Sequence, residues 1–167
     1  MTSLAALDET FLRQAIQLSR QALENQGKTP FGAILVQANE VIGRGTSSVV
    51  QLHDPSAHAE VMALRDAGAK LKQHLFETAV LYASSEPCPM CLAACYWARV
   101  SRIVFGATVN DVATNGFEDL QFYREIAKPI GQRSLREETG NEQLRREAVS
   151  ALRAWTSNLE APVEPKT

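Results

Sequence analysis

Two short stretches decide how this chain folds and which chemistry it carries: DPSAHAEV at residues 54–61 and EPCPMCL at residues 86–92. Between them they supply one imidazole, from His58, and two thiols, from Cys88 and Cys91. Zinc prefers these ligand types, and a catalytic zinc site takes three protein ligands and leaves a fourth position for water. The two stretches therefore predict a zinc site with His58, Cys88 and Cys91 as the metal ligands.

Glu60 adds a carboxylate two residues beyond His58. That spacing is too short for both side chains to reach one metal from a single helical turn, so Glu60 is predicted to stand beside the ligands. Zinc lowers the pKa of a bound water from about 16 to about 7. A neighbouring carboxylate can take the proton and later return it to a leaving group, which makes Glu60 the predicted general base and general acid.

Both stretches also contain signals for the start of a helix. Asp54 and Pro55 are an N-cap type of residue and a proline suited to a first helical position, and Pro89 plays the same part after Cys88. Helix N-termini carry a partial positive charge that favours thiolates. The spacing of three residues lets Cys88 and Cys91 converge within one turn.

Each ligand has a simpler interpretation when it is considered alone. A Cys-x-x-Cys pair also occurs in structural zinc knuckles and redox pairs, and a single histidine is usually an ordinary satisfied side chain. The succession of His-x-Glu, a strand-like segment and Pro-Cys-x-x-Cys is the signature of zinc deaminases, and it favours a catalytic site. A non-enzyme zinc-binding module is the alternative from another class, but it needs a fourth ligand, and no residue has suitable spacing.

The sequence resembles the cytidine deaminase-like superfamily, within it the branch of guanine deaminases and tRNA adenosine deaminases. The resemblance runs from about Phe11 to Lys128. Besides the two motifs it includes PFGA at residues 30–33 and YWAR at residues 96–99. It implies an α/β fold of three layers, α/β/α, with a mixed sheet of about five strands. It also implies hydrolytic deamination, one Zn²⁺ per subunit and a homodimer.

The segment GFED at residues 116–119 resembles guanine deaminases more than the tRNA enzymes. By that resemblance Asp119 contacts the purine, and a carboxylate can accept the N–H groups of guanine at N1 and the 2-amino position. The simpler alternative is that Glu118 and Asp119 begin an exposed helix, where acidic residues are favourable. Guanine is therefore the expected substrate, with cytosine or another nucleobase or nucleoside as an alternative.

The same resemblance assigns further substrate contacts. Phe31 stacks on the base, Trp97 walls the pocket and the backbone N–H of Ala59 anchors the substrate. Core packing is an equal alternative for Trp97. Family members commonly carry an asparagine where this chain has Ser47, so the shorter hydroxyl of Ser47 is expected to change that contact.

Global features bound the function. The chain has 167 residues and predicts one deaminase domain over residues 1–158, with a disordered, proline-rich tail at residues 159–167. That tail lacks the aromatic residue with which certain guanine deaminases close the site. A formal charge of −2 and a pI of about 5.9 argue against nucleic acid as a partner, although tRNA adenosine deamination is the leading alternative.

The expected location is the cytoplasm, without membrane attachment. The chain contains no apolar stretch long enough to cross a bilayer, and its polar start lacks the features of a signal peptide. Three cysteines, two of them at ligand spacing, suit a reducing compartment better than a disulfide framework. Cys95, one helical turn after Cys91, is expected to be a packing residue.

Hydrophobic periodicity predicts alternating strands and helices, in a sheet that is covered on both faces and binds its ligand at the carboxyl ends of strands. Gly43 and Gly45 in the second strand mark a bulge or a close backbone approach. The last helix has an apolar stripe that packs on the sheet or covers a neighbouring subunit. The predicted helices span residues 9–26, 56–71, 89–99 and 141–158, and the predicted strands span residues 31–37, 41–50, 78–85 and 102–108.

Overall fold

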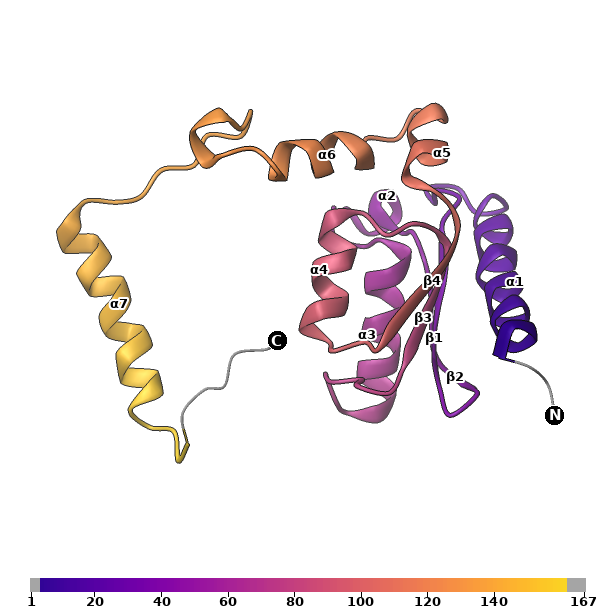
Figure 1. Ribbon diagram of the computed structural model, residues 1–167, viewed down its shortest axis with the longest axis horizontal. Helices are drawn as coiled ribbons and strands as arrows, with labels where there is room; N and C mark the ends of the chain where they lie inside the picture. The colour runs from indigo at the N-terminus through magenta and orange to yellow at the C-terminus, as the bar shows by residue number, and fades with distance from the viewer. Residues whose placement is uncertain (1–3, 162–167) are drawn as a thin grey trace. The chain divides into compact units, whose positions relative to one another are not determined.

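The computed structural model describes residues 4–161 of the chain (Figure 1). They divide between Arg124 and Glu125 into two compact units. One domain over residues 1–158 stays a prediction, and most of the predicted tail, residues 162–167, lies outside the described part of the chain. None of the described helices combines the length and the apolar character that a membrane crossing requires.

The first unit holds a mixed sheet with the strand order β2-β1-β3-β4. Strand β1 runs antiparallel to both β2 and β3, while β3 and β4 are parallel. The predicted α/β class is confirmed, with four strands in the described residues where about five were expected. The strands are β1 (Gly32–Gln37), β2 (Glu40–Thr46), β3 (Val80–Ser85) and β4 (Arg102–Ala107).

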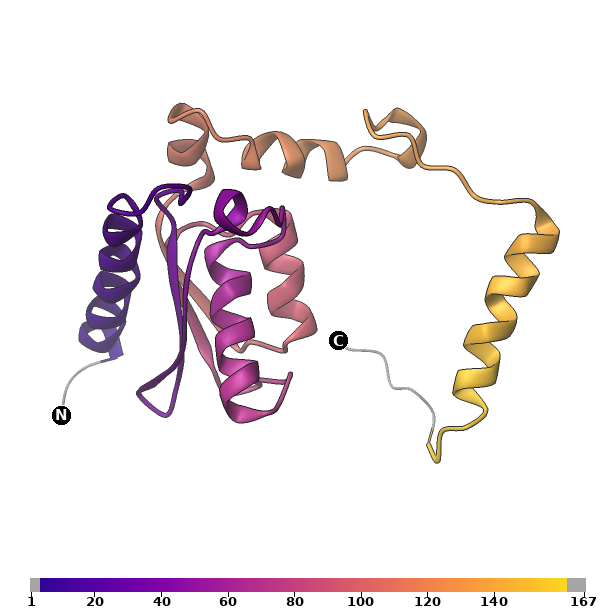
Figure 2. The same ribbon diagram turned by 180° about the vertical axis from the view of Figure 1, so that it is seen from behind.

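Helices cover both faces of this sheet. Figures 1 and 2 show α1 on one face and α3 with α4 on the other, which gives the three predicted layers. The helices that belong to the first unit or begin in it are α1 (Leu4–Ala22), α2 (Val49–Leu52), α3 (Ala59–Leu71), α4 (Pro89–Trp97), α5 (Val109–Thr114) and α6 (Asp119–Ile126).

Alternation along β1 builds a separate core on each face, because successive side chains of a strand point to opposite sides. Ile34 and Val36 pack in a cluster with Phe11 of α1, whereas Ala33 and Leu35 pack in a second cluster that includes residues of α3 and α4. All four β1 side chains are at most 4% exposed. The second cluster also contains Cys95, so the predicted packing role of Cys95 agrees with its position.

Two glycines of β2 let α3 lie directly against the sheet. A Cβ atom at Gly45 would stand 2.1 Å from the carbonyl oxygen of Ala59, and one at Gly43 would stand 2.3 Å from that of Ala63. Only a residue without a side chain fits at such distances. Close backbone approach is found at both glycines and fixes the start of α3. The predicted bulge also has a counterpart beside Gly43, because the register shifts between the pairs Leu35–Gly43 and Val36–Val41.

The second unit contains the 3₁₀ helix η1 (Ile130–Gln132) and the helix α7 (Glu142–Thr156). Asn141 caps α7, since its side chain accepts a hydrogen bond of 3.0 Å from the backbone N–H of Leu144. The helix has no buried residue, and Leu144, Leu152 and Trp155 on its apolar stripe are exposed. Both expected roles of the stripe, packing on the sheet and covering a neighbouring subunit, stay predictions.

Candidate active site

The three predicted metal ligands lie at the starts of two helices. His58 is the N-cap residue of α3 and Cys88 is the N-cap residue of α4, while Cys91 belongs to the first turn of α4. The carbonyl oxygens of both N-cap residues accept the first intrahelical hydrogen bonds, each of 2.9 Å, from Met62 and Leu92. Unpaired N–H groups and positive dipole ends therefore surround the donors, an environment that favours thiolates.

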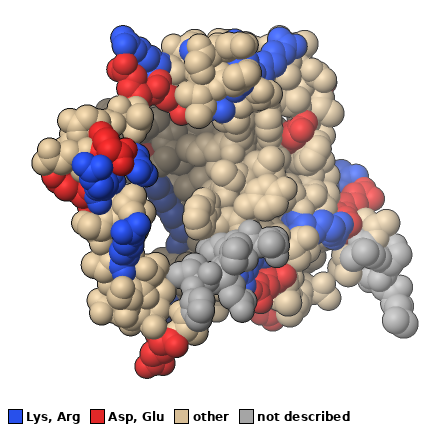
Figure 3. Space-filling model, turned by 60° about the vertical axis from the view of Figure 1, so that its left-hand side comes forward, with Lys and Arg blue, Asp and Glu red and all other residues tan. Residues whose placement is uncertain are grey.

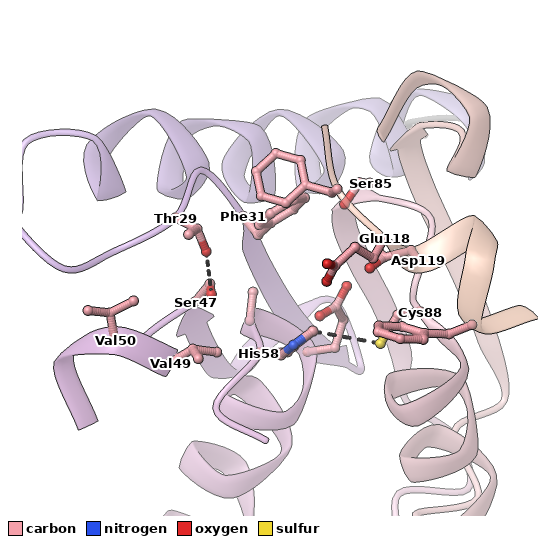
Figure 4. A pocket seen from close by; sticks show the side chains of 14 residues that line it. Thr29, Phe31, Ser47, Val49, Val50, His58, Ser85, Cys88, Glu118 and Asp119 are labelled. Carbon is pink, nitrogen blue, oxygen red and sulfur yellow. Dashed lines mark hydrogen bonds between the residues drawn. The ribbon is translucent and has the colours of Figure 1, made fainter. Parts of the chain in front are cut away.

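The geometry of the three donors fits a zinc ion. The ligand atoms of His58, Cys88 and Cys91 all lie within 4.8 Å of one another, and Cys88 Sγ is 3.6 Å from His58 Nδ1 (Figure 4). A sulfur and a nitrogen at the usual zinc bond lengths stand about 3.6 Å apart in a tetrahedral arrangement. Both the donor types, one imidazole and two thiols, and the distances between the donor atoms are thus suited to a three-ligand zinc site.

Hydrogen bonding makes one of the two thiols a donor and the other an acceptor. The Cys91 thiol, with help from His58, lowers the pKa of the Cys88 thiol to about 4. The pKa of Cys91 is raised, because Cys91 donates to Cys88 and is buried. The pKa of His58 is raised as well, mainly by its hydrogen bond with Cys88. Cys88 is therefore anionic near neutral pH, the form that binds a metal.

Glu60 is a buried carboxyl group in the first turn of α3, with only 5% of its surface exposed. Burial raises the pKa of Glu60, while a hydrogen bond from its own backbone N–H acts in the opposite direction. A carboxyl group whose pKa is raised towards neutrality can both accept and donate a proton in one reaction cycle. The environment of Glu60 is thus suited to the transfer of protons.

A cavity of about 200 Å³ opens over these groups. Figure 4 shows Phe31 and Asp119 turned towards the cavity that His58 and Cys88 also face. Its lining contains all the predicted substrate contacts except one: Phe31, Ser47, Ala59 and Asp119. Since Ala59 is the first residue of α3, its N–H has no acceptor within the helix and is available to a ligand.

Trp97 is the exception. It lies at the last position of α4, does not line the cavity and is 69% exposed. The prediction that Trp97 walls the pocket is corrected, and so is its alternative of core packing. The physical reason is the orientation of α4, which turns Cys91 and Cys95 inward and the indole outward.

The outer wall of the cavity comes from the segment before α6. The Phe117 ring meets the Phe31 ring edge to face, with centroids 4.8 Å apart and planes at 80°. Asp119, the first residue of α6, is half-buried, and this desolvation, with the negative charge of Cys88, raises the pKa of its carboxyl group. Glu118 also lines the cavity but is exposed.

Several residues that line the cavity were not predicted from the sequence. Thr29 donates a hydrogen bond of 2.6 Å to the Ser47 hydroxyl (Figure 4), so the two hydroxyls form a pair at one side of the cavity. The register of the first hairpin, in which Gly32 lies opposite Thr46, is a signal that would have placed Thr29 near Ser47. The other residues that were missed as part of the lining are Val49, Val50, Ser85, Phe117 and Phe122.

Comparison with known proteins agrees with this geometry. The family model for the cytidine and deoxycytidylate deaminase zinc-binding region matches residues 5–107, well over half of the chain. The chain belongs to the cytidine and deoxycytidylate deaminase family. It is thus a zinc-binding deaminase, a hydrolase that acts on C–N bonds.

The relatives of this deaminase include guanine deaminases and tRNA-specific adenosine deaminases. Guanine deaminase of Bacillus subtilis is 41% identical over 127 residues, which are 76% of this chain and 81% of that protein. The tRNA-specific adenosine deaminase of Buchnera aphidicola subsp. Schizaphis graminum is 40% identical over 110 residues, which are 66% of this chain and 72% of that protein. The X-ray structure of the Bacillus subtilis guanine deaminase superposes with a TM-score of 0.85 at 36% identity, covering 93% of this chain and 97% of that one.

Proposed function

We propose that this deaminase hydrolyses guanine to xanthine and ammonia, with a zinc ion held by His58, Cys88 and Cys91. The observation that carries the proposal is the half-buried Asp119 carboxylate, which lines the same cavity as His58, Glu60 and Cys88. The 41% identity to a guanine deaminase, with the structural similarity to the same protein, supports the choice of substrate.

Recognition of the base follows from the chemistry of the lining. The Asp119 carboxylate only accepts hydrogen bonds when ionised, which matches a purine with N–H donors on its edge. The flat apolar ring of Phe31 offers a stacking surface, and the free N–H at the start of α3, from Ala59, offers a donor to a ring acceptor. Ser47, which accepts from Thr29, keeps its own hydroxyl proton available to the substrate.

Glu60 carries the protons of the reaction. Zinc, when bound, supplies Lewis acidity that allows water to react as a nucleophile near neutral pH. A carboxylate oxygen of Glu60 takes a proton from the attacking water, returns it to the ring nitrogen next to the reacting carbon, and carries the second proton to the departing amine. Water and guanine thus give xanthine and ammonia, with Glu60 restored.

Deamination of adenosine in tRNA is the second candidate, favoured by the 40% identity to a tRNA-specific adenosine deaminase. Such an enzyme has to hold phosphates, usually with a basic surface. On the face shown in Figure 3, Lys and Arg side chains lie beside Asp and Glu side chains. The formal charge of −2 and the carboxylate of Asp119 further favour a neutral free base over a nucleic acid as the substrate.

We infer that the deaminase acts as a homodimer. The exposed apolar side chains of α7, among them Leu144, Leu152 and Trp155, support this, because exposed stripes of this kind commonly mark protein interfaces. A cytoplasmic location is likewise a proposal. It is supported by the free thiols of Cys88, Cys91 and Cys95, which a reducing compartment preserves.

The proposal is tested by ammonia release from zinc-loaded protein. The substrates are guanine, guanosine, adenine, adenosine, cytosine and a tRNA, and the control is Glu60→Gln, which keeps the shape of the side chain but cannot carry a proton. We expect turnover of guanine by the wild type, none by the variant, and equal zinc content in both. Consumption of another substrate with guanine inert would refute the guanine proposal and leave the deaminase family intact.

A further inference from the structure

The helix that presents Asp119 to the cavity has little packing of its own. No residue of α6 is buried, and even Phe122, which lines the cavity, is 48% exposed. Burial of apolar surface is the main force that fixes most helices on a protein. It contributes little here, so the position of Asp119 depends on other contacts.

One hydrogen bond joins this helix to the metal-binding turn. The hydroxyl of Tyr123 donates to the carbonyl oxygen of Pro87 over 2.7 Å. Pro87 directly precedes Cys88, the N-cap residue of α4. Within residues 4–161, no other hydrogen bond of α6 reaches the chain before residue 108.

The spacing on α6 relates this bond to Asp119. Residues four apart on a helix lie on the same face, one turn from each other. Asp119 and Tyr123 have this spacing, so the contact between Tyr123 and Pro87 holds the face of α6 that presents Asp119. The edge-to-face contact between Phe31 and Phe117 holds the chain just before the helix, which leaves Tyr123 to fix the rotation and height of α6 itself.

We propose that Tyr123 is a positioning residue of the deaminase, which anchors α6 to the Pro87 turn so that Asp119 meets the substrate. The inference rests on the proposed function in one respect, the contact between Asp119 and the N–H groups of guanine. Tyr123 itself makes no bond to the substrate. Its effect is to keep Asp119 at a fixed place relative to the ligands at the start of α4.

Tyr123→Phe removes the hydroxyl and nothing else, and Tyr96→Phe is the matched control because Tyr96 is 74% exposed and lies outside the cavity lining. A neutral hydrogen bond changes an equilibrium by roughly two- to tenfold. We expect Tyr123→Phe to raise KM for guanine by that factor, with kcat within about twofold of the wild type and zinc content unchanged. An unchanged KM would overturn the role.

A double-mutant cycle with Asp119→Asn separates positioning from a general structural effect. If Tyr123 acts through Asp119, Tyr123→Phe raises KM less in the Asp119→Asn protein than in the wild type. The same factor in both backgrounds would show that Tyr123 acts independently of Asp119, and the proposal would be wrong.

Amide hydrogen exchange gives a readout that does not depend on turnover. We expect the amides of residues 119–124 to exchange about two- to tenfold faster in Tyr123→Phe than in the wild type or Tyr96→Phe, with no change over residues 89–97. Equal exchange in the three proteins would refute anchoring. If the wild type releases no ammonia from guanine, the proposed function fails, while the exchange rates still decide whether Tyr123 anchors α6.

Discussion

Replacing Gly45 by alanine tests whether the close approach of α3 to the sheet sets the metal site. The added methyl would stand 2.1 Å from the Ala59 carbonyl oxygen and 2.5 Å from the Ala63 nitrogen, whereas ordinary contact begins at 3.4 Å. The strand and the helix would therefore separate by about 1.3 Å. Both contacts are backbone atoms of a helix, so no side-chain rotation can relieve them.

The energetic cost follows from these contacts. Overpacking of this kind costs roughly 1–3 kcal/mol, and we take about 3 kcal/mol because backbone has to move. Alanine restricts the unfolded chain more than glycine does, which offsets up to about 1 kcal/mol of this cost. The net loss in the free energy of unfolding is therefore about 2 kcal/mol. For a chain of this size that corresponds to a fall in Tm of about 4–8 °C.

The same displacement weakens the metal site. His58 immediately precedes α3, so a shift of the helix changes the distance of 3.6 Å between His58 Nδ1 and Cys88 Sγ. Zinc ligands tolerate errors of only about 0.2 Å. We therefore expect Gly45→Ala to retain less zinc than the wild type after dialysis against a weak chelator.

The assays are thermal unfolding followed by circular dichroism and zinc content by elemental analysis. Gly131→Ala is the matched control, because a Cβ atom at Gly131 meets nothing within 4 Å. This control is expected to melt within about 1 °C of the wild type or slightly above it. If Gly45→Ala has the same Tm as the control and keeps its zinc, the close approach of α3 to β2 does not determine the geometry of the metal site.

Two further changes probe stability and substrate recognition. Arg102 and Tyr82 lower the pKa of Asp8 to about 2, from an ordinary value of 3.8, so the ionised carboxylate stabilises the fold above about pH 4 and this contribution is lost as the pH falls through 2. Asp8→Asn should therefore lower the stability by about 1 kcal/mol at pH 7, after allowance for solvent screening, and melting curves from pH 7 to 2 should show this difference shrink; a constant difference would contradict the assignment. Thr29→Val removes the hydrogen bond to Ser47 without a change in shape, and we expect KM for guanine to rise about two- to fivefold with Tm and kcat nearly unchanged. An unchanged KM in steady-state assays would mean that the hydroxyl pair does not contact the substrate.

The sequence by itself determined the features that depend on short spacing. Cys88 and Cys91 lie three apart behind a helix start, and Pro89 marks that start, so both thiols had to lie within one turn. The alternation along β1 fixed which side chains pack on each face, because the period of a strand is two residues. Gly43 and Gly45 predicted a bulge or a close approach of backbones. Such features are local, and local geometry can be read from the order of residues.

Only the tertiary structure decided which distant residues meet. His58 and Cys88 are thirty positions apart in sequence, yet their donor atoms are 3.6 Å apart because α3 and α4 pack on one face of the sheet. Packing of α4 on this face leaves Trp97 exposed. The helical period alone could not tell which side of α4 would face the sheet. The bond from Tyr123 to Pro87 joins segments thirty-six residues apart. Contacts of this kind depend on how whole helices and strands are placed relative to one another. Packing of the two cores sets that placement, and the spacing of residues within a single segment does not reveal it.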